Sequence, residues 1–220
     1  YQALWASDVQ KESGELSIYL PPKENFTDSL KTLQVGDMIS LMGPTGVRTK
    51  INCSPAGLMI LIGDITVCYY ALSVVAPLKR QGHQVMVLLN TSGQNEGKQF
   101  LVQELTSLCL LREFQDFDEI HSLLKDQEEL MAVHVCAQYN HWTERYWAWV
   151  QEDPTHALFK IPTLAFVPTA MQCMLKGICA RCLQWQWDPQ THESTKAVFA
   201  CSWPQQPIEF IDFSKAGCRE

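Results

Sequence analysis

Short apolar segments alternate with longer helical ones between Leu58 and Val167, and this order limits the fold more than any other feature of the chain. Strands separated by helices in this way form a parallel sheet whose faces are covered by the helices. The sequence therefore predicts an α/β fold in this region. The predicted strands are 58–62, 84–89, 131–137 and 163–167, and the predicted helices are 66–80, 97–111, 117–126 and 142–152.

The parts of the chain on either side have different patterns. Apolar and polar residues alternate in Glu15–Leu20 and in Asp37–Met42, which predicts a partial β-barrel in residues 1–53. The last part is rich in cysteine and has the pattern of a β-hairpin. We therefore expect three units, namely this partial barrel in 1–53, an α/β domain in 54–168, and a small cysteine-rich module in 169–220.

Four cysteines gather near the end of the chain. Cys173, Cys179 and Cys182 have the spacing C-x5-C-x2-C, and Cys201 follows after eighteen further residues. Alternating segments on both sides of the turn at 188–194 predict a hairpin between the last two cysteines. Its antiparallel register would place Cys201 opposite a residue next to Cys182, with Cα atoms roughly 4.5 to 5.5 Å apart. The four thiols are therefore expected to converge on a metal.

The spacing favours iron over zinc. Plant-type two-iron clusters use C-x4-C-x2-C and a distant fourth cysteine, which differs by one residue from the spacing here. A zinc ribbon needs two C-x2-C knuckles, and only the pair Cys179 and Cys182 forms one. We favour a 2Fe-2S cluster and keep zinc and unligated core cysteines as alternatives. A thioredoxin-like dithiol fits less well, because two more cysteines share the same region.

The segment Met171–Cys182 resembles the M-x-C-G-x-G-x-C-x-x-C run of the electron-transfer subunit of dihydroorotate dehydrogenase B and of related hydrogenase gamma subunits, in the ferredoxin-reductase superfamily. Gly177 matches the second glycine of that run, while Met174 replaces the first and the first loop is one residue longer. Members of the family have a flavin barrel, a pyridine-nucleotide domain and a C-terminal 2Fe-2S cluster. The resemblance therefore implies a partial flavin-barrel-like region in 1–53, an NAD(P)-binding-like domain in 54–168 and an iron-sulfur module in 169–220. The resemblance implies that the four cysteines hold such a cluster and relay single electrons between a flavin and a partner.

A second resemblance concerns the flavin. Residues 25–37, with Gly43-Pro44-Thr45-Gly46 beyond, are similar to the family's G-x-x-T-x-x-L-x-x-L-x-x-G-D and G-P-x-G motifs. The threonine region of the family lies against the flavin pyrophosphate, so the resemblance implies contacts with FAD. The family's arginine that faces the flavin phosphates would fall near Tyr1–Leu4, where no arginine occurs, and this argues against FAD binding. The implied contact residues are Thr27, Ser29, Gly43 and Thr45.

The family's glycine-rich turn after the first strand of the nucleotide domain corresponds to 63–66 here. Glycine allows a pyrophosphate to approach the backbone closely at a helix N-terminus. Gly63 retains that property, but Asp64 would bring a negative charge to the place of the phosphate. We therefore expect weak or absent NAD(P) binding, with the sheet kept as a scaffold.

The composition excludes some partners. A formal charge of −7, without a run rich in Lys or Arg, argues against nucleic acid. Nine cysteines predict a reducing cytoplasm, and the apolar runs are too short to cross a membrane. The chain begins at Tyr1 without a methionine, so we interpret it as part of a longer protein. The expected partner is another redox subunit or an upstream flavin domain, and an oligomer is compatible with the sequence.

Three hypotheses for function follow. The favoured one is the electron-transfer component of an oxidoreductase. A non-redox alternative is a zinc-stapled or metal-free docking module of a larger enzyme, which the altered turn at Gly63 and the missing arginine support. A third places FAD and NAD(P)H in an upstream domain of a longer flavoenzyme, which explains a retained cluster beside lost local sites.

Overall fold

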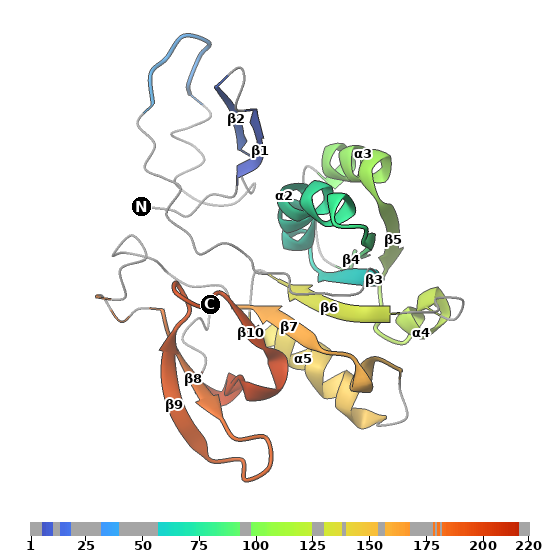
Figure 1. Cartoon of the computed structure of the whole chain (residues 1–220), viewed down its shortest axis with the longest axis vertical. Coiled ribbons are helices and arrows are strands. Elements are labelled where there is room, and N and C mark those ends of the chain that lie inside the picture. Colours follow the sequence, from blue (N-terminus) through green and yellow to red (C-terminus); the bar gives the residue numbers. More distant parts are fainter. Residues whose placement is uncertain are drawn as a thin grey trace.

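A computed structural model describes residues 6–10, 14–18, 32–39, 57–92, 98–124, 130–137, 140–153, 157–167, 178, 180 and 182–215. Its centre is a six-stranded sheet with the strand order β10-β7-β6-β3-β4-β5 (Figure 1). Five strands are parallel, and β10 joins the edge antiparallel to β7. The strands are β3 (Leu58–Gly63), β4 (Gln84–Asn90), β5 (Leu110–Phe114), β6 (Leu130–Cys136), β7 (Thr163–Phe166) and β10 (Gln205–Pro207).

Helices cover both faces of this sheet. Met59 and Leu61 of β3 pack with α2 (Thr66–Arg80) and α3 (Lys98–Leu108). Ile60 and Ile62 of the same strand belong to the cluster that includes α4 (Glu119–Leu124) and α5 (Asn140–Glu152). Figure 1 shows α2 and α3 on one side of the sheet and α5 on the other. A strand buried on both faces must be apolar throughout, which explains the continuous hydrophobic run of β3.

The cysteine-rich segment forms the predicted hairpin from β8 (Leu183–Trp187) and β9 (Ser194–Phe199). The chain then returns to the central sheet as β10 and ends its described part in two short 3-10 helices, η2 (Ile208–Phe210) and η3 (Phe213–Lys215). A third, η1 (Ala157–Lys160), precedes β7. The return to the sheet was not predicted, because Gln205–Pro207 is too short to show an alternating pattern.

The amino-terminal part contains an antiparallel pair, β1 (Ala6–Gln10) and β2 (Glu15–Ile18). This confirms β structure there, whereas the partial barrel itself stays a prediction. The predicted strand at 37–42 is wrong for residues 37–39, which follow a turn and are not in a strand. In that turn Gly36 has φ +102°, and the Asp37 amide donates to the Gln34 carbonyl at 3.0 Å. The hydrophobic alternation there reflects exposed residues, since Met38 is almost fully accessible.

A second correction concerns the region after α3. The helix predicted for 97–111 ends at Leu108, and the chain continues as β5, an edge strand parallel to β4. Its residues are mostly exposed and only Phe114 is buried, so the segment lacks the apolar pattern of a core strand. Backbone pairing with β4 decides its conformation, which is a tertiary effect that overrides local propensity.

No helix in the described ranges is long and apolar enough to cross a membrane.

Candidate metal centre and nucleotide-binding turn

The hairpin brings the backbones of two of the four predicted ligands close to each other. Leu183 pairs with Phe199, and the Ala200 amide donates to the Cys182 carbonyl at 2.8 Å. Cys201 therefore lies one residue beyond the Cys182–Ala200 pair, opposite a chain neighbour of Cys182, as the sequence predicted. Both cysteine side chains are buried, at 2% and 4% exposure, in one hydrophobic cluster.

The other two predicted ligands, Cys173 and Cys179, lie outside the described residues. Within the described ranges, no three His, Cys, Asp or Glu side chains converge as a metal site would require. The four-thiol site therefore stays a prediction. The donor chemistry of the described half fits it, because two buried thiols that form no disulfide can become thiolates in an apolar cluster if a metal neutralises them.

The backbone between Cys179 and Cys182 is unusual. Ala180 has φ +56°, in the left-handed region that residues with a Cβ rarely adopt. Its carbonyl accepts a hydrogen bond from Leu183 N at 3.2 Å, so the turn leads directly into β8. Such strained residues concentrate at ligand sites, where the surrounding structure holds them in place. A sequence cannot reveal this feature, because alanine has no preference for positive φ.

The chain that follows the hairpin anchors it. The Asp212 amide donates to the Trp185 carbonyl at 3.0 Å, and the Trp187 indole donates to the Glu209 carbonyl at 2.7 Å. On the buried face, the Gln186 side-chain amide donates to Gln206 Oε1 at 3.0 Å. Strand β8 is therefore held between β9 and the segment 206–212. This fixes the position of Cys182, which directly precedes β8.

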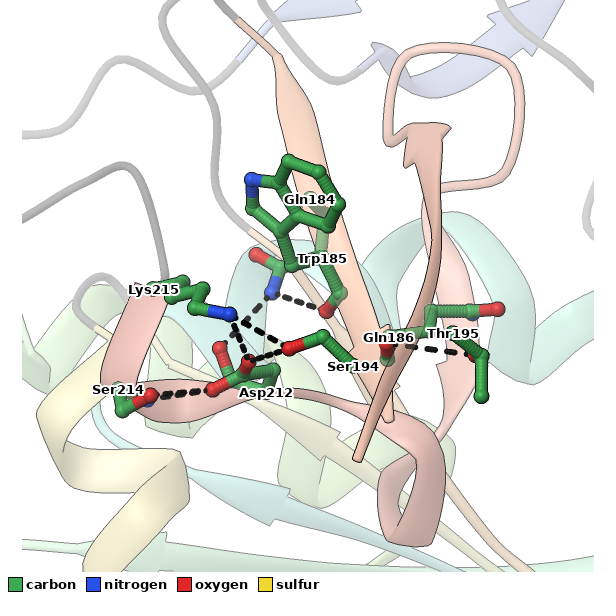
Figure 2. Close-up of polar contacts among 8 residues, drawn as sticks. All are labelled: Gln184, Trp185, Gln186, Ser194, Thr195, Asp212, Ser214 and Lys215. Atoms are coloured by element: carbon green, nitrogen blue, oxygen red, sulfur yellow. Dashed lines mark hydrogen bonds and ion pairs between the residues drawn. The ribbon is translucent and has the colours of Figure 1, made fainter. Parts of the chain in front are cut away.

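Asp212 is the centre of this anchor (Figure 2). Its carboxylate accepts hydrogen bonds from the hydroxyl groups of Ser194, at 3.0 Å, and of Ser214, and the Lys215 ammonium lies 3.6 Å away. Burial alone would raise the pKa of Asp212, but the two serines and the Lys215 charge together hold this pKa below its ordinary value. The same Lys215 ammonium also lies 5.5 Å from the centre of the Trp185 ring.

Replacement of Asp212 by asparagine is expected to lower the free energy of unfolding at pH 7 by about 1 to 2 kcal/mol, because the serine hydroxyls lose a charged acceptor. Since the folded pKa is depressed, the stabilisation is present above the unfolded pKa of 3.8 and is lost as the pH falls through the folded value. Urea unfolding at pH 7 and at pH 3 measures both effects. Glu209→Gln, in the same segment, is the control and should change stability by less than about 0.5 kcal/mol. An Asp212→Asn protein as stable as the wild type at pH 7 would contradict the anchor.

Other cysteines pack as ordinary thiols. Cys68 and Cys136 are buried in the cluster under α2. Burial, with a smaller effect of the Asp64 charge, raises the pKa of the Cys136 thiol well above its usual value. Burial likewise raises the pKa of Cys109 to about 11, although the Lys79 charge lowers it slightly. The Cys136 and Cys109 thiols therefore stay protonated near neutral pH.

Two tryptophans of the module are partly exposed. Trp185 and Trp203 are 39% and 40% accessible, and the Lys196 ammonium lies 5.9 Å from the centre of the Trp203 ring. Trp187 is half-buried and its indole is hydrogen-bonded. The indoles of Trp185 and Trp203 therefore each leave part of their surface open to solvent.

The residues implied as FAD contacts, Thr27, Ser29, Gly43 and Thr45, all lie outside the described residues, and their role stays a prediction. Gly63 is described. An added Cβ there would lie 1.7 Å from the Cys136 carbonyl oxygen, so glycine allows β3 and β6 to approach at their carboxyl ends. Its steric role is therefore shown, while contact with a cofactor remains a prediction.

Sequence reasoning missed a buried polar chain. The Gln205 side-chain amide donates to the Tyr70 hydroxyl, which lies 3.0 Å from His134 Nδ1 and can donate its own proton there. This chain connects β10, α2 and β6. Burial lowers the pKa of His134 to about 4. The detectable signal was a single polar residue, His134, within the apolar run of β6.

Comparison with known proteins finds similarity both in sequence and in structure. The chain is 26% identical over 217 residues to the uncharacterized protein RP006 of Rickettsia prowazekii (strain Madrid E), and it spans 24% of that protein's length. It superimposes with a TM-score of 0.70 and 16% identity on a solved structure of an NADH-dependent reduced ferredoxin-NADP oxidoreductase studied for flavin-based electron bifurcation, over 97% of this chain and 74% of that one. No protein-family model matches the sequence. The parallel sheet, its helices and the small antiparallel hairpin together make this a ferredoxin-reductase-like α/β fold.

Proposed function

We propose that this chain is an electron-transfer component of an oxidoreductase, in which Cys173, Cys179, Cys182 and Cys201 hold a 2Fe-2S cluster. The single electrons would pass between a flavin and a partner protein or domain. The observation that supports the proposal is the hydrogen bond from Ala200 N to the Cys182 carbonyl. It joins the backbone of the third cysteine of the motif to the residue that precedes the fourth, Cys201, and both cysteine side chains are buried.

Three further facts support this function. The left-handed Ala180 lies inside the C-x2-C segment, where a tight turn would direct backbone amides toward a ligand. The cysteine spacing resembles that of a family with a C-terminal cluster. The structural neighbour is a flavin-based redox enzyme, so the same fold serves electron transfer in at least one solved protein. When bound, the cluster would accept or release one electron, and the chain's own residues would hold its iron and exclude water.

The test is a metal analysis of protein purified without oxygen. We expect about two iron and two sulfide per chain, with visible absorption from thiolate-to-iron charge transfer. Cys182→Ser and Cys201→Ser should each lose most of the iron and the absorption. Cys109→Ser is the matched control, because the Cys109 thiol, directly after α3, donates to the Leu105 carbonyl and a hydroxyl can replace it there.

Stoichiometric zinc without visible absorption would instead identify the zinc-stapled docking module. If the wild type and all three variants contain no metal, the four cysteines are unligated core thiols. Either result would remove the electron-transfer function.

A further inference from the structure

The strand order reverses between β3 and β6. Chain connections from β3 lead to β4 and β5 on one side, while β6 and β7 follow on the other. In open parallel sheets, ligands bind outside the carboxyl ends of the strands at this point, and the phosphates of a dinucleotide take the free amides of the first helix. In this chain that place is the turn from Gly63 to the start of α2.

The amides at the start of α2 already have partners within the chain. The Asp64 carboxylate accepts a hydrogen bond from Thr66 N at 2.8 Å. The Asp64 carbonyl accepts from Val67 N at 2.9 Å, and the Ile65 carbonyl accepts from Cys68 N at 3.1 Å. The backbone amides of Thr66, Val67 and Cys68, which could donate to a phosphate, thus already donate to acceptors of the chain itself. The acceptor of the first amide is a negatively charged carboxylate.

The base of the turn is closely packed. The carbonyl oxygen of Cys136 lies 1.7 Å from the position where a Cβ of Gly63 would be, so the chain itself fills that side of the glycine. Val67 and Cys68 in the first turn of α2 are fully buried. The negative charge of Asp64 further opposes a pyrophosphate, which would have to displace the carboxylate and then lie beside it.

We propose that the Asp64 carboxylate takes the place of a phosphate at the start of α2 and closes this domain to NAD(H) and NADP(H). If the chain has the proposed electron-transfer function, this closure also determines the path of the electrons. Reducing equivalents reach the cysteine module as electrons from a flavin or metal centre of another domain or subunit, and not by hydride transfer from a nicotinamide bound at this sheet.

Calorimetric titration of the full chain with NADH and with NADPH tests the closure. Both dinucleotides should bind more weakly than about 1 mM, and saturable binding tighter than that would overturn the proposal.

The role of the carboxylate is tested with inorganic pyrophosphate. Asp64→Asn keeps an acceptor for Thr66 N but removes the charge, so its pyrophosphate affinity should rise about tenfold over the wild type. Asp64→Gly also frees the amide and should show at least as large an increase, provided that it folds. Asp116→Asn is the matched control, because Asp116 accepts from Asp118 N in a similar turn after β5. Equal pyrophosphate affinity in Asp64→Asn and the wild type would overturn the role assigned to Asp64.

Failure of this inference and failure of the proposed function are distinguishable. The calorimetric measurement of nucleotide binding does not depend on the iron content. Iron-free protein that does not bind dinucleotide would contradict the proposed cluster and support the closed turn. Iron-loaded protein that binds NADH tightly would support the cluster and contradict the closed turn.

Discussion

Replacement of Gly63 by alanine is expected to destabilise the fold by more than about 3 kcal/mol. The new Cβ would lie 1.7 Å from the Cys136 carbonyl oxygen and 2.7 Å from its carbonyl carbon. These are backbone atoms of β6, in the middle of the sheet, and they cannot move without breaking the pairing of Gly63 with Cys136. The strands would have to separate at the centre of the core. Urea unfolding, or the yield of folded protein, measures the effect.

Gly14→Ala is the control for this experiment. Gly14 has φ +72°, but no atom lies within 4 Å of the position that its Cβ would occupy. Alanine there meets only the backbone penalty of the left-handed region, about 1 to 2 kcal/mol. A Gly63→Ala protein no less stable than Gly14→Ala would show that β3 and β6 are not in contact at this residue pair.

Acidification is expected to weaken the fold through His134. Burial keeps the His134 ring neutral in the folded state, with a pKa of about 4, while the unfolded chain binds the proton near the ordinary value of 6.5. Stability is therefore fully present above pH 6.5 and declines as the pH falls toward 4, where the folded state also becomes protonated. The contribution lost over this interval is about 3 kcal/mol. Urea unfolding at several pH values between 7 and 4 measures it.

His134→Asn separates this effect from other acid effects. An asparagine side-chain oxygen can accept the hydrogen bond of the Tyr70 hydroxyl in place of Nδ1, but it does not titrate. The variant should show a flatter pH dependence of stability than the wild type. His192→Asn is the matched control, since His192 is exposed and its φ of +56° suits asparagine. If the free energy of unfolding of His134→Asn and of the wild type changed with pH in parallel, the His134 ring could not be neutral and buried in the folded state.

The polar chain that contains His134 connects the cysteine module to the central sheet. Gln205 belongs to β10, which follows the hairpin, and Tyr70 belongs to the helix that starts at the Asp64 turn. Its sequence signal was a lone histidine, which gave no indication of Tyr70, 64 residues away, or of Gln205, which bonds to Tyr70 across 135 residues. Neither partner could be inferred, because hydrogen bonds between distant segments leave no local periodicity.

Local patterns were sufficient for the elements that bury a regular face. Helix α2 has the predicted bounds, β3, β4 and β7 differ from their predicted bounds by one residue at one end, and β6 is shifted by one residue at both ends. The hairpin was also predicted, since alternation on both sides of a turn sets the register in which Cys201 lies opposite a chain neighbour of Cys182. The edge strand β5 was missed because an exposed strand needs no apolar pattern.

The sequence by itself determined a parallel sheet covered by helices and a cysteine-bearing hairpin, because burial of strands and helices imposes hydrophobic periods that can be read along the chain. Only the tertiary structure decided that β10 returns to the sheet edge, that Gly63 lies against the Cys136 carbonyl, and that the Asp64 carboxylate occupies the start of α2. These features depend on distances between atoms that folding brings together, and such distances have no counterpart in residue order.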